Sequence, residues 1–291
     1  MKTIQKTAIG AAAVALLSGL ACSAAFAADT PANPEDAGLP ISANVTVVSD
    51  YRYRGISQSN FKPAIQGGFD YAHESGFYIG NWNSSISWIS DAASAGGSKN
   101  VSAPIEMDFY AGFKKELIGE GFASDFGVLQ YYYPTSGIPN TGGYTANPNT
   151  TEIYAAQNFT FGPFTGFAKV SYAVSTLFGT INSTGSYYPD LTVNYDTGIW
   201  GISLNGHIGY QYVAGQPVTS GPLLQGQNNL SYTDFKVGAT KDFGGGLSLS
   251  AAYVSTNANP VWWNTWSSTT TGVMTSSAGR PGAVVSLTKV F

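Results

Sequence analysis

Polar and apolar residues alternate along most of the chain after residue 40. The first such segment, 44–54, places aromatic and aliphatic side chains on one face and polar ones on the other: Val45, Val47, Tyr51 and Tyr53 against Asn44, Thr46, Asp50, Arg52 and Arg54. The same alternation recurs in 65–71, 105–114, 190–196, 200–212 and 234–237. A period of two predicts half-buried strands. About twelve segments have the length that a tilted membrane-spanning strand needs.

The segments between these strands alternate in length. Short connections are expected at 73–76, 116–121, 162–163, 197–198 and 242–245. Long connections rich in Gly, Ser, Thr, Asn and Pro fall at 55–62, 90–103, 134–150, 177–188, 214–229 and 257–280. Short periplasmic turns and long extracellular loops are typical of outer-membrane proteins. The sequence therefore predicts an all-β fold, a transmembrane antiparallel up-and-down β-barrel of about twelve strands.

Composition supports a barrel in lipid. The chain has 35 Gly, 18 Tyr, 16 Phe and 6 Trp but only 10% charged residues. No stretch after Ala27 approaches the roughly 20 apolar residues of a membrane helix. A chain that spans a membrane without helices must close into a barrel, because lipid cannot satisfy the backbone of an open sheet. The alternative is a soluble β-sandwich with an aromatic core, which would carry more surface charge.

Aromatic residues are expected to form two girdles at the lipid boundaries. The girdle at the outer ends of the strands is predicted from Tyr51, Tyr53, Tyr131, Tyr133, Tyr210, Tyr212 and Tyr253. The girdle near the periplasmic turns is predicted from Tyr71, Phe113, Phe161, Tyr195, Trp200 and Phe243.

The N-terminus has the pattern of a secretory signal peptide. Lys2 and Lys6 precede an apolar run, and Ala25-Phe26-Ala27 forms a small-x-small cleavage site. We expect residues 1–27 to be removed after export through the Sec pathway, 28–40 to be a flexible periplasmic segment, and 41–291 to form the barrel. Cleavage removes the single cysteine, Cys22, and leaves 11 basic and 17 acidic residues, a net charge of −6. This sign does not favour binding of nucleic acid.

The last segment predicts a final barrel strand. Val285, Leu287 and Phe291 share one face, with Ser286 and Thr288 between them. A final strand that ends on an aromatic residue is similar to the signal that the barrel-assembly machinery reads, so this machinery is an expected partner. Lys289 departs from that pattern, but a lysine near the water interface can extend its ammonium group into water at small cost.

The polar faces of the strands are expected to line the lumen. Six ionisable residues toward the outer half are the candidates for a constriction: Arg52, Arg54, Glu106, Asp108, Glu152 and Asp190. Six others are also expected to face the lumen: Asp50, Asp70, Lys169, His207, Asp234 and Lys236. Charges of both signs can select permeants. They can equally pair and plug a narrow barrel, and the loops 134–150 or 257–280 could fold inward and close it.

Several motifs resemble one known family. The segments are 48–58 (VSDYRYRGISQ), 63–71 (PAIQGGFDY), 106–112 (EMDFYAG) and 125–134 (DFGVLQYYYP). They resemble the TorF family of proteobacterial outer-membrane proteins assigned as porins, over the first half of the mature chain. The resemblance implies an outer-membrane barrel with a pore role in a Gram-negative envelope. It implies neither a substrate nor site residues.

Other functions have weaker support. An outer-membrane phospholipase needs a serine nucleophile with a histidine, but His73 and His207 lie in no nucleophile motif. We therefore expect no enzyme, no metal site and no cofactor. A receptor or structural barrel that does not conduct stays open, because the tryptophans in 261–266 can contact a partner. The favoured hypothesis is a channel for small hydrophilic solutes or ions, embedded in outer-membrane lipid and lipopolysaccharide.

Overall fold

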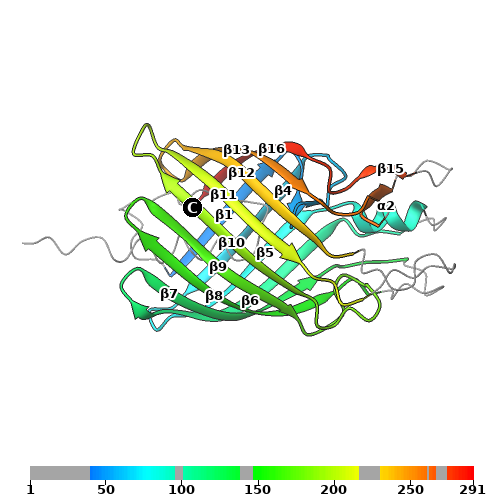
Figure 1. Ribbon diagram of the computed structural model, residues 1–291, viewed down its shortest axis with the longest axis horizontal. Helices are drawn as coiled ribbons and strands as arrows, with labels where there is room; N and C mark the ends of the chain where they lie inside the picture. The colour runs from blue at the N-terminus through cyan, green and yellow to red at the C-terminus, as the bar shows by residue number, and fades with distance from the viewer. Residues whose placement is uncertain (1–39, 96–100, 138–146, 216–229, 261, 267–273) are drawn as a thin grey trace, which may run out of the picture.

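Twelve antiparallel strands close into a barrel in the computed structural model, which describes residues 40–95, 101–137, 147–215, 230–260, 262–266 and 274–291. The barrel strands follow the chain order around the wall, and the first pairs with the last (Figure 1). They are β1 (Ile41–Val48), β4 (Ala64–Ala72), β5 (Phe77–Ser85), β6 (Ile105–Gly119), β7 (Phe122–Tyr132), β8 (Thr150–Phe161), β9 (Phe164–Ala173), β10 (Tyr187–Asp196), β11 (Ile202–Gln211), β12 (Tyr232–Asp242), β13 (Leu247–Thr256) and β16 (Gly282–Val290). The predicted fold class and strand number are confirmed.

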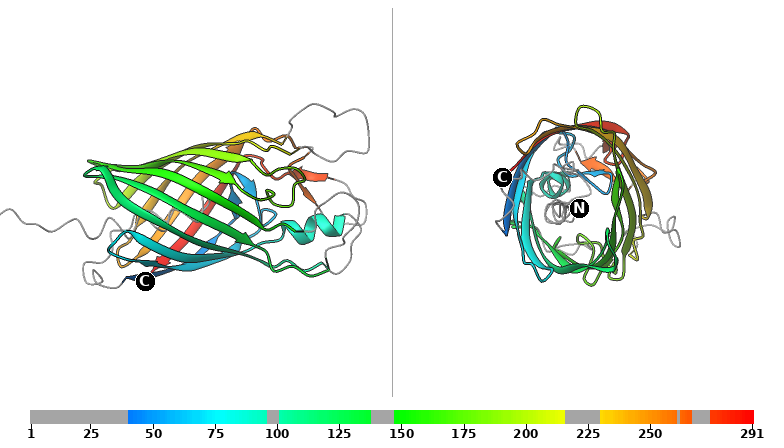
Figure 2. Two further views of the ribbon diagram at one scale, coloured as in Figure 1. Left: turned by 90° about the horizontal axis from the view of Figure 1, so that it is seen from below. Right: turned by 90° about the vertical axis from the view of Figure 1, so that its left-hand side faces the viewer.

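Three smaller elements lie at the end of the barrel that carries the long loops. They are the two-stranded sheets β2 (Arg52–Tyr53) with β3 (Ile56–Ser57) and β14 (Asn264–Trp266) with β15 (Met274–Ser277), and the helix α2 (Trp88–Ala95). Seen along the barrel axis, α2 lies within the outline of the wall (Figure 2). No helix in the described ranges is long and apolar enough to cross a membrane.

The helix α2 is an element that the sequence analysis assigned to a loop. Ser87 precedes its first residue and accepts the backbone N–H of Asp91, while its hydroxyl contacts the Asp91 side chain at 2.8 Å. Ser is a favoured N-cap residue, so the helix has a local start signal. The backbone N–H of Trp88 is bonded instead to the carbonyl of Gln58, 3.2 Å away, which attaches α2 to the loop after β1.

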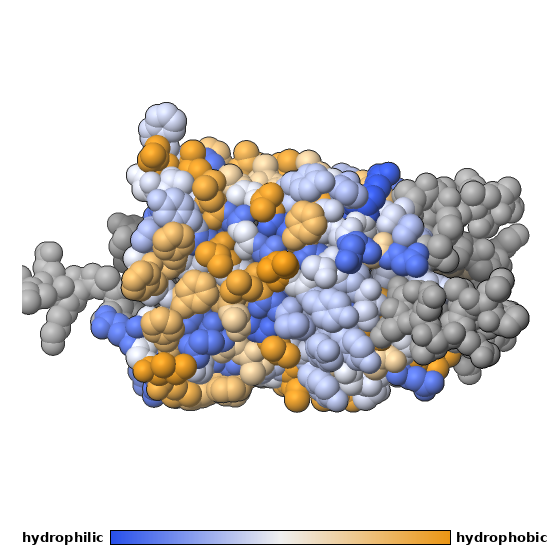
Figure 3. Space-filling model, viewed as in Figure 1, coloured by the Kyte–Doolittle hydropathy of each residue, from blue (hydrophilic) through white to orange (hydrophobic). Residues whose placement is uncertain are grey.

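The outer surface of the wall is apolar. Large exposed side chains alternate along each strand, as with Leu204 and Ile208 of β11 and Phe235 and Val237 of β12. Figure 3 shows hydrophobic side chains over the outer face of the strands visible there. A water-soluble protein does not expose a continuous apolar surface of this kind. The barrel therefore spans a membrane, with its backbone hydrogen bonds satisfied between strands.

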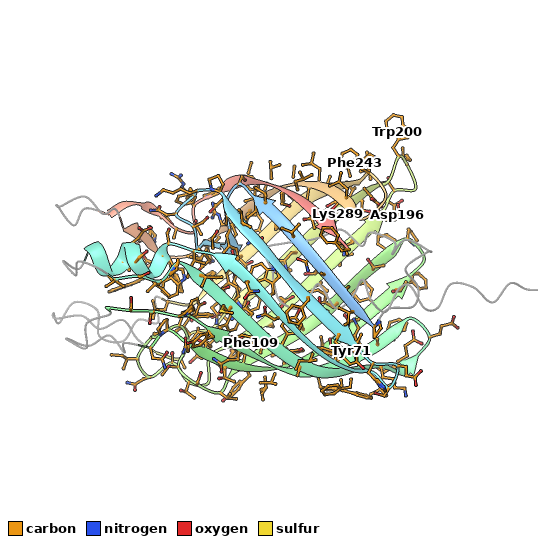
Figure 4. The ribbon with its side chains drawn as sticks, turned by 180° about the vertical axis from the view of Figure 1, so that it is seen from behind. Tyr71, Phe109, Asp196, Trp200, Phe243 and Lys289 are labelled. Atoms are coloured by element: carbon orange, nitrogen blue, oxygen red, sulfur yellow. The ribbon has the colours of Figure 1, made fainter. Side chains whose placement is uncertain are left out.

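Only part of the expected aromatic girdles lies on this surface. At the turn end, Trp200 and Phe243 project outward and are 81% and 55% exposed (Figure 4). At the loop end, Tyr210 and Tyr253 are exposed as predicted. The remaining prediction is wrong for four residues, because Tyr51, Tyr53, Tyr131 and Tyr133 are buried inside the barrel.

Two outward-facing lysines at the turn end extend toward the end of the barrel, which the sequence analysis expected of Lys289. The Lys289 ammonium donates to the carbonyl of Gly245 and lies 5.2 Å from the ring centre of Phe291. Lys241 donates to the carbonyl of Trp200 in the same manner. Both side chains reach polar backbone at the end of the barrel, as lysines near a membrane boundary do. The predicted signal peptide and most of the predicted periplasmic segment lie outside the described residues.

Candidate functional site

The loop that joins β1 to β4, residues 49–63, enters the barrel, and we call it the inner loop. Every residue from Asp50 to Ser59 is buried. The sequence predicted a strand through Arg54, which is wrong: β1 ends at Val48 and the chain then turns inward. Arg54 has a positive φ of 45° and Gly55 one of 77°, which permits the tight turn between β2 and β3. The loops 134–150 and 257–280 were the ones expected to fold inward, and parts of both lie outside the described residues.

The inner loop contacts strands on several sides of the barrel. The hydroxyl of Tyr51 donates to Glu106 of β6, and the hydroxyl of Tyr53 lies 2.7 Å from that of Tyr131 of β7. A Cβ atom at Gly55 would lie 2.8 Å from the Cβ of Asp234 of β12. These contacts place the inner loop across the lumen, near the end of the barrel that carries the long loops. There the inner loop narrows the lumen.

Arg54 joins the inner loop to side chains of three barrel strands. Its guanidinium lies 2.7 Å from a carboxylate oxygen of Glu152 and donates to the side chain of Gln211. It also lies 4.8 Å from the ring centre of Tyr53 and 4.2 Å from that of Tyr188. Burial acts to lower the pKa of Arg54, but the Glu152 carboxylate raises that pKa well above its ordinary value. The inner loop is thus held by a charged arginine between two rings and a carboxylate.

Two other candidates for the constriction, Glu106 and Arg52, contact different residues from those that Arg54 contacts. Glu106 accepts hydrogen bonds from Tyr51 and from Tyr133, the latter at 2.6 Å. Arg52 pairs with Asp50 within the inner loop and donates to the carbonyls of Ala278 and Arg280. The structure therefore brings Arg54 and Glu152 together, but it places Arg52 on a different set of partners.

Asp108 and Asp190 differ from these residues because their carboxylates have no hydrogen-bond partner among the described residues. Asp190 has only a distant ion pair with Lys169, at 3.7 Å. Asp108 is fully buried, and neither of its oxygens is hydrogen-bonded. It faces the interior between Glu106 and Tyr110 of the same strand. All six candidates thus lie inside the barrel, but they do not form one cluster.

The second group of predicted residues also faces the lumen. Asp70 accepts a hydrogen bond from Tyr110, and Lys236 is buried. His207 lies 2.9 Å from the Tyr188 hydroxyl and 3.1 Å from Asp234 through Nε2, and 2.9 Å from Thr192 through Nδ1.

Sequence reasoning missed the tyrosines and one acid that accompany these charges. Asp125 of β7 is fully buried and accepts a hydrogen bond of 2.7 Å from Tyr78, whose hydroxyl also contacts that of Tyr154. Asp125, Tyr131 and Tyr133 share one face of a period-two strand. Continuing that period from Asp125 would have placed the two tyrosines in the lumen.

Acidic residues exceed basic ones in the described part of the lumen. Eight carboxylates are buried: Asp50, Asp70, Glu106, Asp108, Asp125, Glu152, Asp190 and Asp234. The buried basic side chains are Arg52, Arg54, Lys236 and the imidazole of His207, while Lys114 and Lys169 are partly buried. No group of three potential ligands among the described residues has the arrangement of a metal site. Acidic side chains thus outnumber basic ones in the described part of the lumen.

The sequence matches one family over nearly its whole length. Residues 32–291 match the model described as "Bacterial protein of unknown function (Gcw_chp)". The chain belongs to the Gcw_chp family. No curated protein matches the sequence of this chain. The description of the family assigns no activity.

Solved structures of outer-membrane barrels are similar to the Gcw_chp chain at low identity. A KdgM porin is 6% identical over 86% of this chain and 98% of its own, with a TM-score of 0.48. The NanC porin has the same identity and coverage, with a TM-score of 0.47. A FadL homologue from Pseudomonas aeruginosa is 13% identical over 87% of this chain and 75% of its own, with a TM-score of 0.43.

Proposed function

We propose that this protein is an outer-membrane channel, without enzymatic activity, through which small hydrophilic solutes or ions diffuse. The barrel is apolar outside and lined by polar and charged side chains inside. The inner loop narrows the lumen toward the loop end, and charged side chains from β6, β8 and β10 face the lumen beside it. Polar side chains around a narrow path are the means by which channels select what passes.

The buried carboxylate oxygens without a hydrogen bond inside the barrel are the observation that supports a channel over a plug. Within the described ranges, both oxygens of Asp108 and Asp190 and one each of Asp125 and Glu152 are buried without a hydrogen-bond partner. In a dry plug each buried carboxylate oxygen without a hydrogen bond would cost about 1–3 kcal/mol of lost hydration. Their presence favours an interior that exchanges water or ions.

A receptor or structural barrel is the second candidate. The interior side chains are packed closely, and α2 lies at the loop end of the barrel (Figure 2). The backbone N–H groups of Ser87 and Trp88 bind the carbonyl of Gln58, so this helix fastens the inner loop. A loop fixed across the lumen in this way is what a non-conducting barrel would need.

The surroundings of the barrel are part of the proposal. Outer-membrane lipid and lipopolysaccharide fit the apolar wall with its aromatic residues at the turn end. Insertion by the barrel-assembly machinery through the strand ending at Phe291, and membership of the TorF family, stay predictions from sequence. The same holds for export through the Sec pathway.

Potassium efflux from liposomes distinguishes the two candidates. Folded protein should release K⁺ from vesicles loaded with potassium chloride, as read by an ion-selective electrode, and heat-denatured protein should not. A protein that inserts and shifts on a gel as a folded barrel, yet releases no K⁺, would support the non-conducting receptor.

A further inference from the structure

Asp108 occupies an unusual place in the wall of the lumen. In the sheet register it is directly opposite Trp82 of β5 on one side and Tyr131 of β7 on the other. All three side chains face the interior, and Trp82 and Tyr131 are 5% and 2% exposed. Directly opposite residues have Cβ atoms about 5 Å apart. The Asp108 carboxylate is thus flanked by two aromatic side chains.

The neighbours of Asp108 are already bound to other groups. Glu106 accepts from Tyr51 and Tyr133, and the Tyr131 hydroxyl lies near Tyr53 and Glu152. The Asp108 carboxylate has no hydrogen bond to any described residue, although it is fully buried. A carboxylate held in this way needs a cation or a proton.

The guanidinium of Arg54 is an example of a cationic group that is bound in the same lumen. Arg54 binds Glu152 at 2.7 Å and stacks between the rings of Tyr53 and Tyr188. A carboxylate together with aromatic rings is the combination that binds ammonium and guanidinium groups. Around Asp108 the carboxylate and the rings are present, and no side chain of the described residues supplies the cation.

We propose that Asp108, Trp82 and Tyr131 form a binding site for the ammonium group of a small organic cation that enters the lumen. The proposal rests on the channel function and names its substrate class. A bare divalent ion fits less well, because the described residues hold no group of metal-ligating side chains. The acidic excess of the lumen draws cations toward the site.

Block of the potassium current tests the site. Putrescine should reduce the current through the wild-type protein in a planar bilayer, and 1,4-butanediol, which has the same carbon chain without charge, should not. Asp108→Asn should weaken the block about tenfold, as for the loss of one charge-assisted hydrogen bond. It should also lower the preference for K⁺ over Cl⁻, measured as a reversal potential. Asp108→Glu keeps the charge and should retain most of both effects.

Asp196→Asn is the matched control, because Asp196 is exposed at the turn end (Figure 4) and its loss should leave the block unchanged. An unchanged block in Asp108→Asn, or equal block by butanediol, would overturn the site. Calorimetric titration of folded protein in micelles with putrescine needs no current. Binding there that depends on Asp108, without conductance, would overturn the channel and keep the site.

Discussion

At the scale of single residues, Arg54 connects the inner loop to the wall. It contacts Glu152, Gln211 and two tyrosine rings, which lie on different strands. Removing one member of a buried ion pair leaves the other charge uncompensated, which costs about 3–5 kcal/mol. The position of the loop and the stability of the barrel therefore both depend on this guanidinium.

Arg54→Met is predicted to lower the free energy of unfolding by about 3 kcal/mol and to raise the conductance, because Glu152 loses its partner and the inner loop is released. Urea titration of protein in lipid vesicles measures the first effect and bilayer recording the second. Adding Glu152→Gln should recover part of the stability, because it removes the unpaired charge. Lys62→Met removes an exposed charge of the same loop and should have little effect on either quantity. Equal effects at 54 and 62 would refute the central role of Arg54.

At the scale of elements, the inner loop is where the sequence prediction and the structure differ most. Alternation continues through Tyr51 and Tyr53, so the pattern indicated one strand up to Arg54. The chain turns inward instead, because Asp50 accepts from Ser57 at 2.6 Å and from Ser59 at 3.2 Å and closes the loop upon itself. Ser57 and Ser59 lie outside the strand pattern, so alternation carries no information about these bonds.

Gly55→Ala is predicted to displace the inner loop. Its Cβ would lie 2.3 Å from Thr256 and 2.8 Å from Asp234, so the loop must move away from the wall. Gly244→Ala is a matched control, because Gly244 has nearly the same φ, +79° against +77°, and no atom within 4 Å of the added Cβ. Both substitutions should cost about 1–2 kcal/mol from the backbone, and only Gly55→Ala should also change the conductance. Identical recordings for both would show that the loop does not set the current.

At the scale of the whole molecule, the closed barrel was predictable, because period-two alternation and alternating loop lengths are properties of many residues at once. The lumen was predictable in which charges face inward, such as Glu152 and Asp190, and not in how they pair. Pairing depends on the inner loop and on tyrosines that the sequence placed at the lipid boundary.

The apolar wall predicts a cost of charge that depends on depth. Val237 lies in the middle of β12 and Ile199 in the turn before β11, and both are 58% exposed. Val237→Arg should destabilise the folded protein in lipid vesicles by about 2–4 kcal/mol and Ile199→Arg by about 1 kcal/mol or less. Equal costs in urea titrations would place the lipid boundary elsewhere on the barrel.

Single-channel recording tests the central claim most directly. Folded wild-type protein added to a planar bilayer in potassium chloride should give discrete current steps, with a reversal potential in a salt gradient that shows preference for K⁺ over Cl⁻. The acidic excess of the lumen is the reason for that sign. Folded, inserted protein that gives no steps at any voltage would contradict the channel.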